Sequence, residues 1–174
     1  MNSTFAELEP NAEPLGPASG FLNEFIEALS PQAPFELLSA EETALLSQYM
    51  ECFGVPRHAT VLREGDDGDS MAILLTGAAV ILKSHHGRQK VVSVLKPGEM
   101  LGEMSLIDGQ TRFASCVTTE PSDFAVLTNA RFKQMLDDHP QMGSKFLLML
   151  LGLTTMRLRI ATTLMLPDLL DGPF

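Results

Sequence analysis

Hydrophobic residues follow two different spacings along this chain, and the changes between them divide it into segments. Within residues 20–58 they recur at helical intervals, first in GFLNEFIEAL, which stops before Pro31, and again in SAEETALLSQYM. Ser39, followed three residues later by Glu42, has the form of a capping box and predicts the start of the second helix. We therefore expect residues 20–58 to form N-terminal helices, with GVPRHA ending the second one.

The spacing changes at residue 59. From there to residue 128, short apolar runs are separated by Gly, Asp, His or Pro, with a turn about every 8–12 residues. This pattern is typical of a meandering β-structure that closes into a sandwich or small barrel. The fold class predicted for the chain is therefore α+β, mainly β.

Residues 129–174 return to helical spacing. NARFKQMLDDHP predicts a short helix that ends before Pro140, and a long helix follows it. The long helix has two apolar stripes. The first contains Phe146, Leu150, Leu153, Ile160 and Leu164, and the second contains Leu147, Leu151, Leu158, Ala161 and Met165.

A helix that is apolar on two sides has to be covered on two sides. The β-structure is expected to cover one stripe, and a second copy of the helix the other, which predicts a homodimer through a parallel coiled coil. The alternative is a helix buried entirely inside its own domain.

Composition restricts the class of protein. The chain has 174 residues, of which 45% are hydrophobic, so it is long and apolar enough for one folded domain. Residues 1–19 are rich in Pro and Glu and predict a flexible acidic tail. The formal net charge of −10 argues against direct binding of nucleic acid, which requires clustered Lys and Arg.

The sequence contains no clear signal for secretion, membrane insertion or metal binding. No basic region followed by an apolar run opens the chain, and the apolar stretch FLLMLLGLTTM is about half the length of a membrane span. Cys52 and Cys116 form no CxxC pair, so we expect a cytoplasmic protein. His85 and His86 lie beside Gly87 and predict a polar turn rather than a metal site.

LGEMSLIDGQTRFAS, residues 101–115, is the stretch that indicates ligand chemistry. Gly102 allows close backbone approach, and GEMSLI is able to form one helical turn whose first N–H groups favour an anion. Arg112 can form bidentate hydrogen bonds to two anionic oxygens. Glu103 repels phosphate but accepts hydrogen bonds from a sugar hydroxyl, so together these residues indicate a nucleotide. The alternative is a surface turn in which Glu103 and Arg112 form an ordinary ion pair.

No catalytic residue is predicted. Ser105 beside Glu103 is the one nucleophile near a carboxylate in this stretch, and no histidine is positioned by the sequence to serve it. We therefore expect a binding protein without a metal or cofactor, rather than an enzyme.

The same stretch resembles the phosphate-binding cassette of the cyclic nucleotide-binding domain family, which reads approximately F-G-E-[LM]-[AS]-L and then R-[AST]-A-[ST]. Residues 101–106 read LGEMSL and residues 112–115 read RFAS, with the family's spacing between Glu103 and Arg112. Upstream, Gly65, Asp69 and Gly77 lie at the places expected for the family. The resemblance covers residues 35 to about 165.

This resemblance implies a β-roll, or jelly-roll barrel, with N-terminal helices, a cassette over residues 101–116 and a long C-terminal helix. Glu103 would accept from the ribose 2′-hydroxyl and Arg112 would bind the cyclic phosphate. Gly102 would allow the close approach. Backbone N–H groups would complete the phosphate site near Met104, Ser105 and Ala114.

The resemblance also assigns the C-terminal helix to capping the base and to dimerisation. Thr162 and Thr163 lie in the region where Thr or Ser of some relatives contacts the base. The alternative is that both are ordinary helix positions near a fraying end.

Phe113 and the end of the chain depart from the family pattern. The family usually has Ala, Ser or Thr where this sequence has Phe113, which is able to stack on a base, shield the phosphate or point into the core. Cyclic AMP is the default ligand, with cyclic GMP, or cyclic di-GMP in a bacterial member, as alternatives. No helix-turn-helix follows, so we expect a stand-alone sensor that signals to a protein effector; the alternative is a non-binding interaction scaffold of the same fold.

Overall fold

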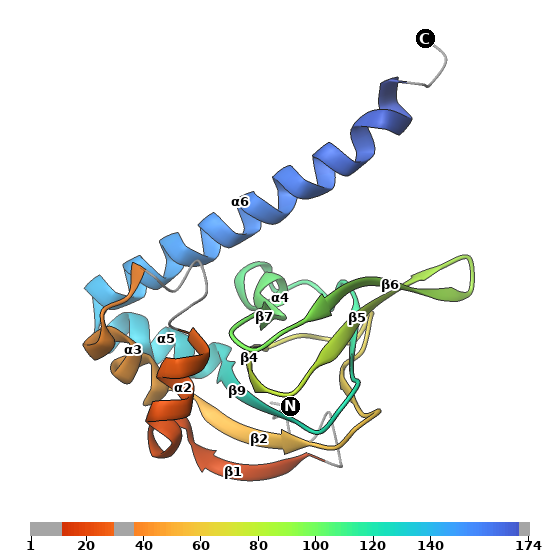
Figure 1. The fold of residues 1–174 in the computed structure, drawn as a ribbon. Helices are drawn as coiled ribbons and strands as arrows, with labels where there is room; N and C mark the ends of the chain where they lie inside the picture. The colour runs from red at the N-terminus through yellow and green to blue at the C-terminus, as the bar shows by residue number, and fades with distance from the viewer. Residues whose placement is uncertain (1–11, 30–36, 171–174) are drawn as a thin grey trace.

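The computed structural model describes residues 12–29 and 37–170, with side chains up to residue 164. Two antiparallel sheets, of strand order β1-β2-β9-β4-β7 and β3-β8-β5-β6, face each other as a β-roll (Figure 1). The strands are β1 (Glu13–Pro17), β2 (Glu51–Val55), β3 (Thr60–Leu62), β4 (Ser70–Thr76), β5 (Ala79–His85), β6 (Arg88–Leu95), β7 (Met100–Leu101), β8 (Ser115–Thr118) and β9 (Ser122–Thr128). The helices are the 3₁₀ helix η1 (Ala18–Phe21), α2 (Leu22–Leu29), α3 (Ala40–Ser47), α4 (Glu103–Asp108), α5 (Asn129–Asp138) and α6 (Pro140–Leu170). The predicted α+β class is confirmed.

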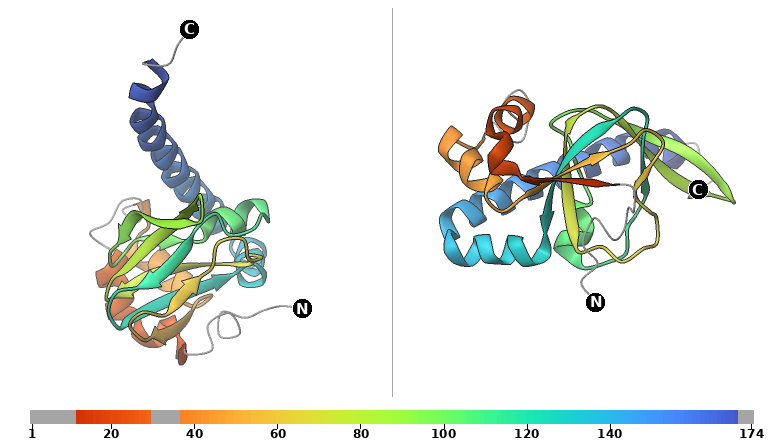
Figure 2. Two further views of the ribbon diagram at one scale, coloured as in Figure 1. Left: turned by 90° about the vertical axis from the view of Figure 1, so that its right-hand side faces the viewer. Right: turned by 90° about the horizontal axis from the view of Figure 1, so that it is seen from below.

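Helices α2, α3, α5 and the start of α6 gather at one end of the roll, and the β5–β6 hairpin extends from the other end (Figure 2). The capping box that predicts α3 is present, because the Ser39 side chain accepts from the Glu42 N–H and the Glu42 carboxylate accepts from the Ser39 N–H. Pro140 is the first residue of α6, a position where proline costs no helical hydrogen bond.

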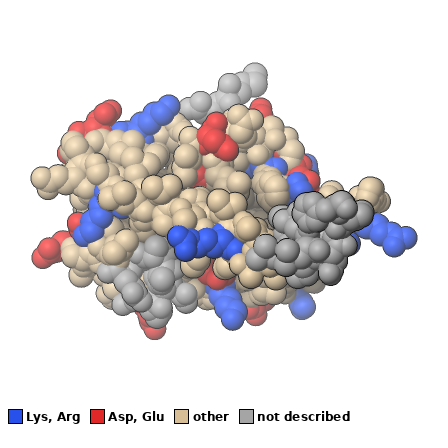
Figure 3. Space-filling view, turned by 90° about the horizontal axis from the view of Figure 1, so that it is seen from above, with Lys and Arg blue, Asp and Glu red and all other residues tan. Residues whose placement is uncertain are grey.

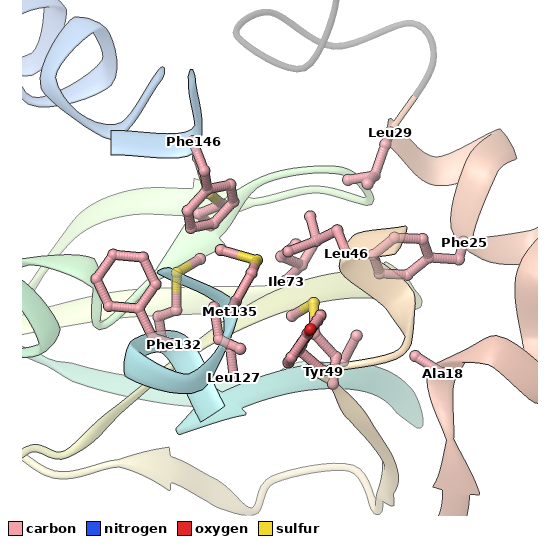
Figure 4. Packing of buried hydrophobic residues seen from close by; sticks show 14 of the residues in the cluster. Ala18, Phe25, Leu29, Leu46, Tyr49, Ile73, Leu127, Phe132, Met135 and Phe146 are labelled. Atoms are coloured by element: carbon pink, nitrogen blue, oxygen red, sulfur yellow. The ribbon is translucent and has the colours of Figure 1, made fainter. Parts of the chain in front are cut away.

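Strands β4 and β9 are buried on both faces and separate two hydrophobic clusters. In β4, Met71 and Ile73 pack with the helices, whereas Ala72 and Leu74 face the interior of the roll. Side chains alternate between the faces of a strand, so this wall needs an almost unbroken apolar sequence, as SMAILLT provides. Figure 4 shows the helical cluster, with Phe146 of α6 pointing toward Met135 and Phe132 of α5.

The first half of α6 is anchored in the hydrophobic core, and the second half has no buried side chain among those that the structure describes. Buried side chains of the first half include Phe146, Leu150 and Leu153, and Lys145 forms an ion pair with Glu42 of α3 at 2.5 Å. From residue 155 to 164 every side chain is exposed except that of Ala161, which is half-buried. The helix extends past the body of the protein (Figures 1 and 2).

Because α6 projects from the body of the protein, burial of the two predicted apolar stripes depends on the position along the helix as well as on the side of the helix. Phe146, Leu150 and Leu153 of the first stripe are buried, as expected, but Ile160 and Leu164 are exposed because the body of the protein ends before them. In the second stripe the side chains of Leu147, Leu151 and Leu158 are exposed and that of Ala161 is half-buried, while the side chain of Met165 lies outside the described residues.

Two segment boundaries require correction. The predicted tail over residues 1–19 includes strand β1, which pairs with β2 even though two prolines and a glycine hide any strand pattern. The second predicted helix ends at Ser47. The segment ECFGV, which was expected to belong to the N-terminal helices over residues 20–58, forms strand β2 instead, because it pairs with β1 on one side and β9 on the other. The rest of the expected tail, residues 1–11, lies outside the described residues.

Helix α6 is also long and apolar enough over Pro140–Leu164 to cross a membrane by length and composition alone. The stretch FLLMLLGLTTM is only part of this span, because Met142 and Gly143 precede it and Leu158, Ile160 and Ala161 follow it. Core helices of soluble proteins pass the same test, and the first half of α6 lies in the core. Absence of a membrane partner stays a prediction.

Candidate functional site

The cassette folds as one short helix between two left-handed glycines. Gly102, with φ of 76°, precedes α4, and Gly109, with φ of 68°, ends it. A Cβ on Gly102 would lie 2.7 Å from Nη1 of Arg112, so no other residue fits there without displacing the arginine. The predicted helical turn in GEMSLI is therefore present, and Gly102 allows Arg112 to approach the backbone.

Arg112 is buried, with 3% of its surface exposed, and is held by the backbone around it. Its Nη1 donates to the carbonyl oxygens of Ser70 at 2.6 Å and Gly102 at 3.1 Å, and its Nη2 donates to Oγ of Ser70 at 3.0 Å. Its own backbone N–H donates to the carbonyl of Asp66 at 2.8 Å. The guanidinium is thus held by Ser70 of β4 and by the Gly102 carbonyl before α4, and the backbone of Arg112 is held by the loop between β3 and β4.

One atom of this guanidinium lacks a partner. Nε of Arg112 is buried without a hydrogen bond, and among the buried side-chain polar atoms described by the structure it is the one in this condition. A buried N–H without an acceptor costs about 1–3 kcal/mol. Burial lowers the pKa of Arg112, while the charges of Asp69, Glu103 and Asp66 raise it. The site is therefore a rigid cation with one donor that lacks an acceptor.

Gly68 lies against that donor. A Cβ there would be 2.6 Å from Cβ of Ser105, 2.7 Å from Nε of Arg112 and 2.8 Å from its Cζ. Only a glycine leaves room for the guanidinium between the β3–β4 loop and α4. The sequence analysis does not single out Gly68; the glycine of GDDGDS, close to Asp69, is the feature that indicates it.

Glu103 has a partner that the sequence analysis also misses. Its carboxylate is 1% exposed and forms an ion pair with Nη1 of Arg157 from α6. Nη2 of Arg157 donates to the carbonyl of Met100 at 2.7 Å. The alternative Glu103–Arg112 ion pair does not form, since each residue is bound elsewhere.

Phe113 points outward from the cassette, with 59% of its surface exposed, so it is not a core residue. The ammonium of Lys83 lies 4.1 Å from the centre of its ring and donates to its backbone carbonyl at 2.5 Å. Nζ of Lys83 also forms an ion pair with the Glu64 carboxylate at 2.7 Å. The hydrogen bond from Lys83 has the largest effect in lowering the pKa of Glu64, and the hydrogen bond from the Ser84 N–H has the second largest.

A cavity of about 300 Å³ opens beside Phe113 and Arg112. Its other walls come from the β3–β4 loop, β5, α4 and the loop after α4. They are formed by Glu64, Gly65, Lys83, Met104, Asp108, Gln110 and Thr111. The cavity therefore has cations, carboxylates and two exposed apolar side chains on its walls, and Arg112, which carries the unpaired donor, is one of its lining residues.

Comparisons with known proteins agree with this geometry. The profile of the family described as "Cyclic nucleotide-binding domain" matches residues 54–139. The crystal structure of a cyclic nucleotide-binding domain from Methylobacillus flagellatus KT is 34% identical, with a TM-score of 0.84 over 97% of each chain. The chain belongs to the cyclic nucleotide-binding domain family.

Curated relatives of this cyclic nucleotide-binding domain include transcription regulators and kinase subunits. The cyclic AMP receptor protein of Thermus thermophilus is 31% identical over 94 residues, which cover 53% of this chain and 44% of that protein. A cAMP-dependent protein kinase regulatory subunit of Mycosarcoma maydis is 32% identical over 93 residues, which cover 53% of this chain and 18% of that protein. The match therefore spans less than half the length of either relative.

The other predicted ligand contacts of the cyclic nucleotide-binding domain fall into two groups. Ser105 is buried, Ala114 is half-buried and Met104 is exposed, all of them in or beside the cassette. Thr162 and Thr163 are exposed, and their hydroxyls donate within α6 to the carbonyls of Leu158 and Arg159 at 2.9 Å. Among the α6 side chains that the structure describes, that of Arg157 forms hydrogen bonds to the cassette and to β7. A contact between the two threonines and the base of a ligand stays a prediction.

Within residues 12–29 and 37–170, no group of three His, Cys, Asp or Glu side chains is arranged to hold a metal ion. His85 and His86 lie at the turn between β5 and β6, which agrees with the predicted polar turn, and their ring centres are 4.2 Å apart in an edge-to-face arrangement. Domains of this family are usually regulatory rather than catalytic, and Glu103 is bound by Arg157 rather than by a nucleophile.

Proposed function

We propose that the protein is a regulatory sensor that binds a cyclic nucleotide, with cyclic AMP as its ligand. The observation that supports this most directly is the buried Nε of Arg112, which lacks an acceptor. A phosphate oxygen supplies that acceptor and a counter-charge for the guanidinium in one contact. The carbonyl oxygens of Ser70 and Gly102 accept from Nη1 and the Ser70 hydroxyl accepts from Nη2, which leaves Nε as the nitrogen that we assign to the ligand.

The rest of the ligand has room and partners nearby. Glu103 is the buried carboxylate of the cassette, and we assign it to the ribose 2′-hydroxyl. The cavity of about 300 Å³ beside Arg112 leaves space next to the phosphate position. Cyclic AMP is favoured over cyclic GMP and cyclic di-GMP because the names of both curated relatives refer to cyclic AMP.

Isothermal titration of the purified protein with cyclic AMP, cyclic GMP and cyclic di-GMP tests this assignment. We expect cyclic AMP to bind with one site per chain and with the highest affinity of the three. No heat with any of them, at concentrations in the hundreds of micromolar, would contradict the sensor. Binding that appears only after Phe113→Ala would instead support a scaffold whose pocket is closed by Phe113.

We propose further that α6 carries the signal to a protein effector. A ligand shifts a helix only by binding one of its positions more tightly than the other. The second half of α6 is exposed and joined to the cassette through Arg157, so its position is open to such a shift.

A homodimer through α6 is part of the same proposal. Leu151 and Leu158 are seven residues apart, so they lie on one side of the helix, and both are exposed. Figure 3, which views the protein from the side of α6, shows a largely uncharged face with a basic cluster near its centre. A second copy of α6 is the occupant that a heptad spacing of leucines favours.

Sedimentation velocity at micromolar concentration is expected to show a dimer, and Leu158→Glu is expected to weaken it about tenfold or more, since the dimer would bury an unpaired charge. Ile160→Glu is the matched control, because Ile160 is also exposed but lies about 200° around the helix from Leu158. A wild-type monomer, or equal effects of both changes, would contradict the α6 seam.

We also propose a reducing, cytoplasmic location. Cys52 and Cys116 are both free and buried. Burial raises the pKa of the Cys116 thiol to about 12 and, together with Asp123 and Glu51, that of Cys52 to about 11. Neither thiol is a reactive group, so both behave as small core residues.

A further inference from the structure

We infer that Phe113 is the stacking surface for the base of the ligand and that Lys83 holds its ring in place, so that the roll, rather than α6, supplies the main contact to the base. This inference rests on the proposed function, because it concerns how the same site selects its ligand. It assigns a role to Lys83, a residue of β5 that lies 30 positions before Phe113 in the chain.

Phe113 is an exposed aromatic side chain on a fixed backbone. The Gly65 N–H, in the β3–β4 loop, donates to the carbonyl of Arg112 at 2.9 Å. On the other side of Phe113, Oγ of Ser115 accepts from the Glu64 N–H at 2.9 Å. The loop therefore holds the chain both before and after Phe113, and the exposed ring extends from a backbone that is tied down on both sides.

The ammonium of Lys83 fixes the ring itself. It lies 4.1 Å from the ring centre and donates to the Phe113 carbonyl at 2.5 Å. The Glu64 carboxylate holds Lys83 in turn, with one oxygen 2.7 Å from Nζ and the other accepting from the Ser84 N–H at 2.8 Å. A cation over one face of the ring leaves the other face to the ligand, and a ring held in this way loses less freedom when a ligand stacks on it.

Phe113 and Lys83 line the same cavity as Arg112. Its volume of about 300 Å³ lies at the lower end of the range for small-molecule sites. A cyclic mononucleotide is compact, so a ligand whose phosphate binds Arg112 places its base in the same cavity. The aromatic ring directly after the phosphate-binding arginine is then the flat apolar surface available to that base.

The two threonines of α6 offer the base less. Thr162 and Thr163 are exposed, and their hydroxyls already donate to carbonyls of their own helix. Neither residue lines the cavity beside Arg112. A base stacked on Phe113 needs no contact with this part of α6, so the observations favour the roll as the base-binding element.

Stacking recognises the size of a base rather than its hydrogen-bonding groups. Every base has a flat π-face, so adenine and guanine both gain from the Phe113 ring. A pyrimidine covers less of the ring and gains less. The inference therefore predicts that Phe113 sets a preference for purine over pyrimidine cyclic nucleotides, without setting the choice between the two purines.

Titration calorimetry with cyclic AMP and cyclic CMP tests the role of the ring. Phe113→Ala is expected to weaken cyclic AMP binding about tenfold or more. It should weaken cyclic CMP binding less, so that the affinity ratio of the two nucleotides falls. The double change Thr162→Ala with Thr163→Ala should weaken cyclic AMP binding less than Phe113→Ala does.

The same titration tests Lys83. Lys83→Met keeps an unbranched side chain but removes the ammonium, and is expected to weaken cyclic AMP binding about threefold, because the ring is no longer held. Lys83→Arg should restore most of the affinity, since a guanidinium also binds an aromatic face. Lys133→Met is the matched control, because Lys133 is an exposed lysine on α5, at the other end of the roll.

Fluorescence gives a second readout that does not depend on affinity. The chain contains no tryptophan, so Phe113→Trp introduces a single indole at the proposed stacking position. This protein should bind cyclic AMP at least as tightly as wild type, and saturating cyclic AMP should quench its emission, because the base lies against the indole. Leu15→Trp is the control and should change little, since Leu15 is exposed on β1, at the opposite edge of the sheet from β7.

Different results would overturn different statements. Unchanged cyclic AMP affinity in Phe113→Ala, or equal losses for the two nucleotides, would overturn the stacking role while leaving the sensor intact. A gain in affinity would show that the ring closes the cavity instead. A larger loss from the two threonine changes than from Phe113→Ala would place the base on α6. Absence of binding by wild type and by every variant would overturn the proposed function together with this inference.

Discussion

Replacing Arg112 with glutamine is expected to lower cyclic nucleotide affinity about a hundredfold. Among the residues that the structure describes, Arg112 carries the buried side-chain donor that lacks an acceptor, and we place the phosphate beside it. Losing a buried charged contact of this kind costs on the order of 1.5–3 kcal/mol, and 2.7 kcal/mol corresponds to about a hundredfold. Glutamine keeps a polar group of smaller size but has neither the charge nor the forked geometry.

Titration calorimetry with cyclic AMP measures this effect, and Arg88→Gln provides the control. Arg88 is exposed on the β5–β6 hairpin, so its replacement removes the same charge far from the cassette in the fold. Circular dichroism should accompany both, because Arg112 also holds Ser70 and Gly102. A folded Arg112→Gln protein that binds within fivefold of wild type would show that the phosphate lies elsewhere.

Replacing Gly68 with alanine is expected both to abolish binding and to destabilise the protein by about 1–3 kcal/mol, as overpacking usually does. The new methyl would lie 2.6 Å from Ser105 and 2.7 Å from Nε of Arg112, which are distances that real side chains do not adopt. The contacts with both Ser105 and Arg112 have to be relieved, so the unpaired donor changes its position relative to the β3–β4 loop. A single methyl group thus tests whether the position of the guanidinium matters.

Urea unfolding gives the loss in stability and calorimetry gives the loss in binding. Gly20→Ala is the matched control, because its added methyl meets no atom within 4 Å. If Gly68→Ala kept wild-type affinity, the guanidinium would have to tolerate displacement, and its fixed position would not define the site.

The sequence predicts those parts of this protein whose cause is local. The α3 cap depends on two side chains three residues apart, and the cassette depends on Gly102, Glu103 and Arg112 within one stretch. The mainly β fold follows from turn residues between short apolar runs. Each of these features is visible within a window of about a dozen residues.

Features that depend on distant pairing are not visible in this way. Strand β1 exists because β2 offers it a partner, although its own sequence suggests a tail. Arg157 reaches Glu103 only because α6 leaves the body at a particular angle over the cassette. Phe113 faces Lys83 rather than the core, an outcome that strand alternation cannot decide next to an irregular loop.

The projecting half of α6 has a mechanical consequence. Helix α6 continues 17 residues beyond Leu153, its last buried residue, to Leu170, which is about 25 Å at a rise of about 1.5 Å per residue. A tilt of about 10° around Leu153 therefore moves the far end by about 4 Å. With its pivot in the helical cluster, a lever of this length would turn a small change of tilt near the cassette into a displacement larger than any side-chain contact at Glu103.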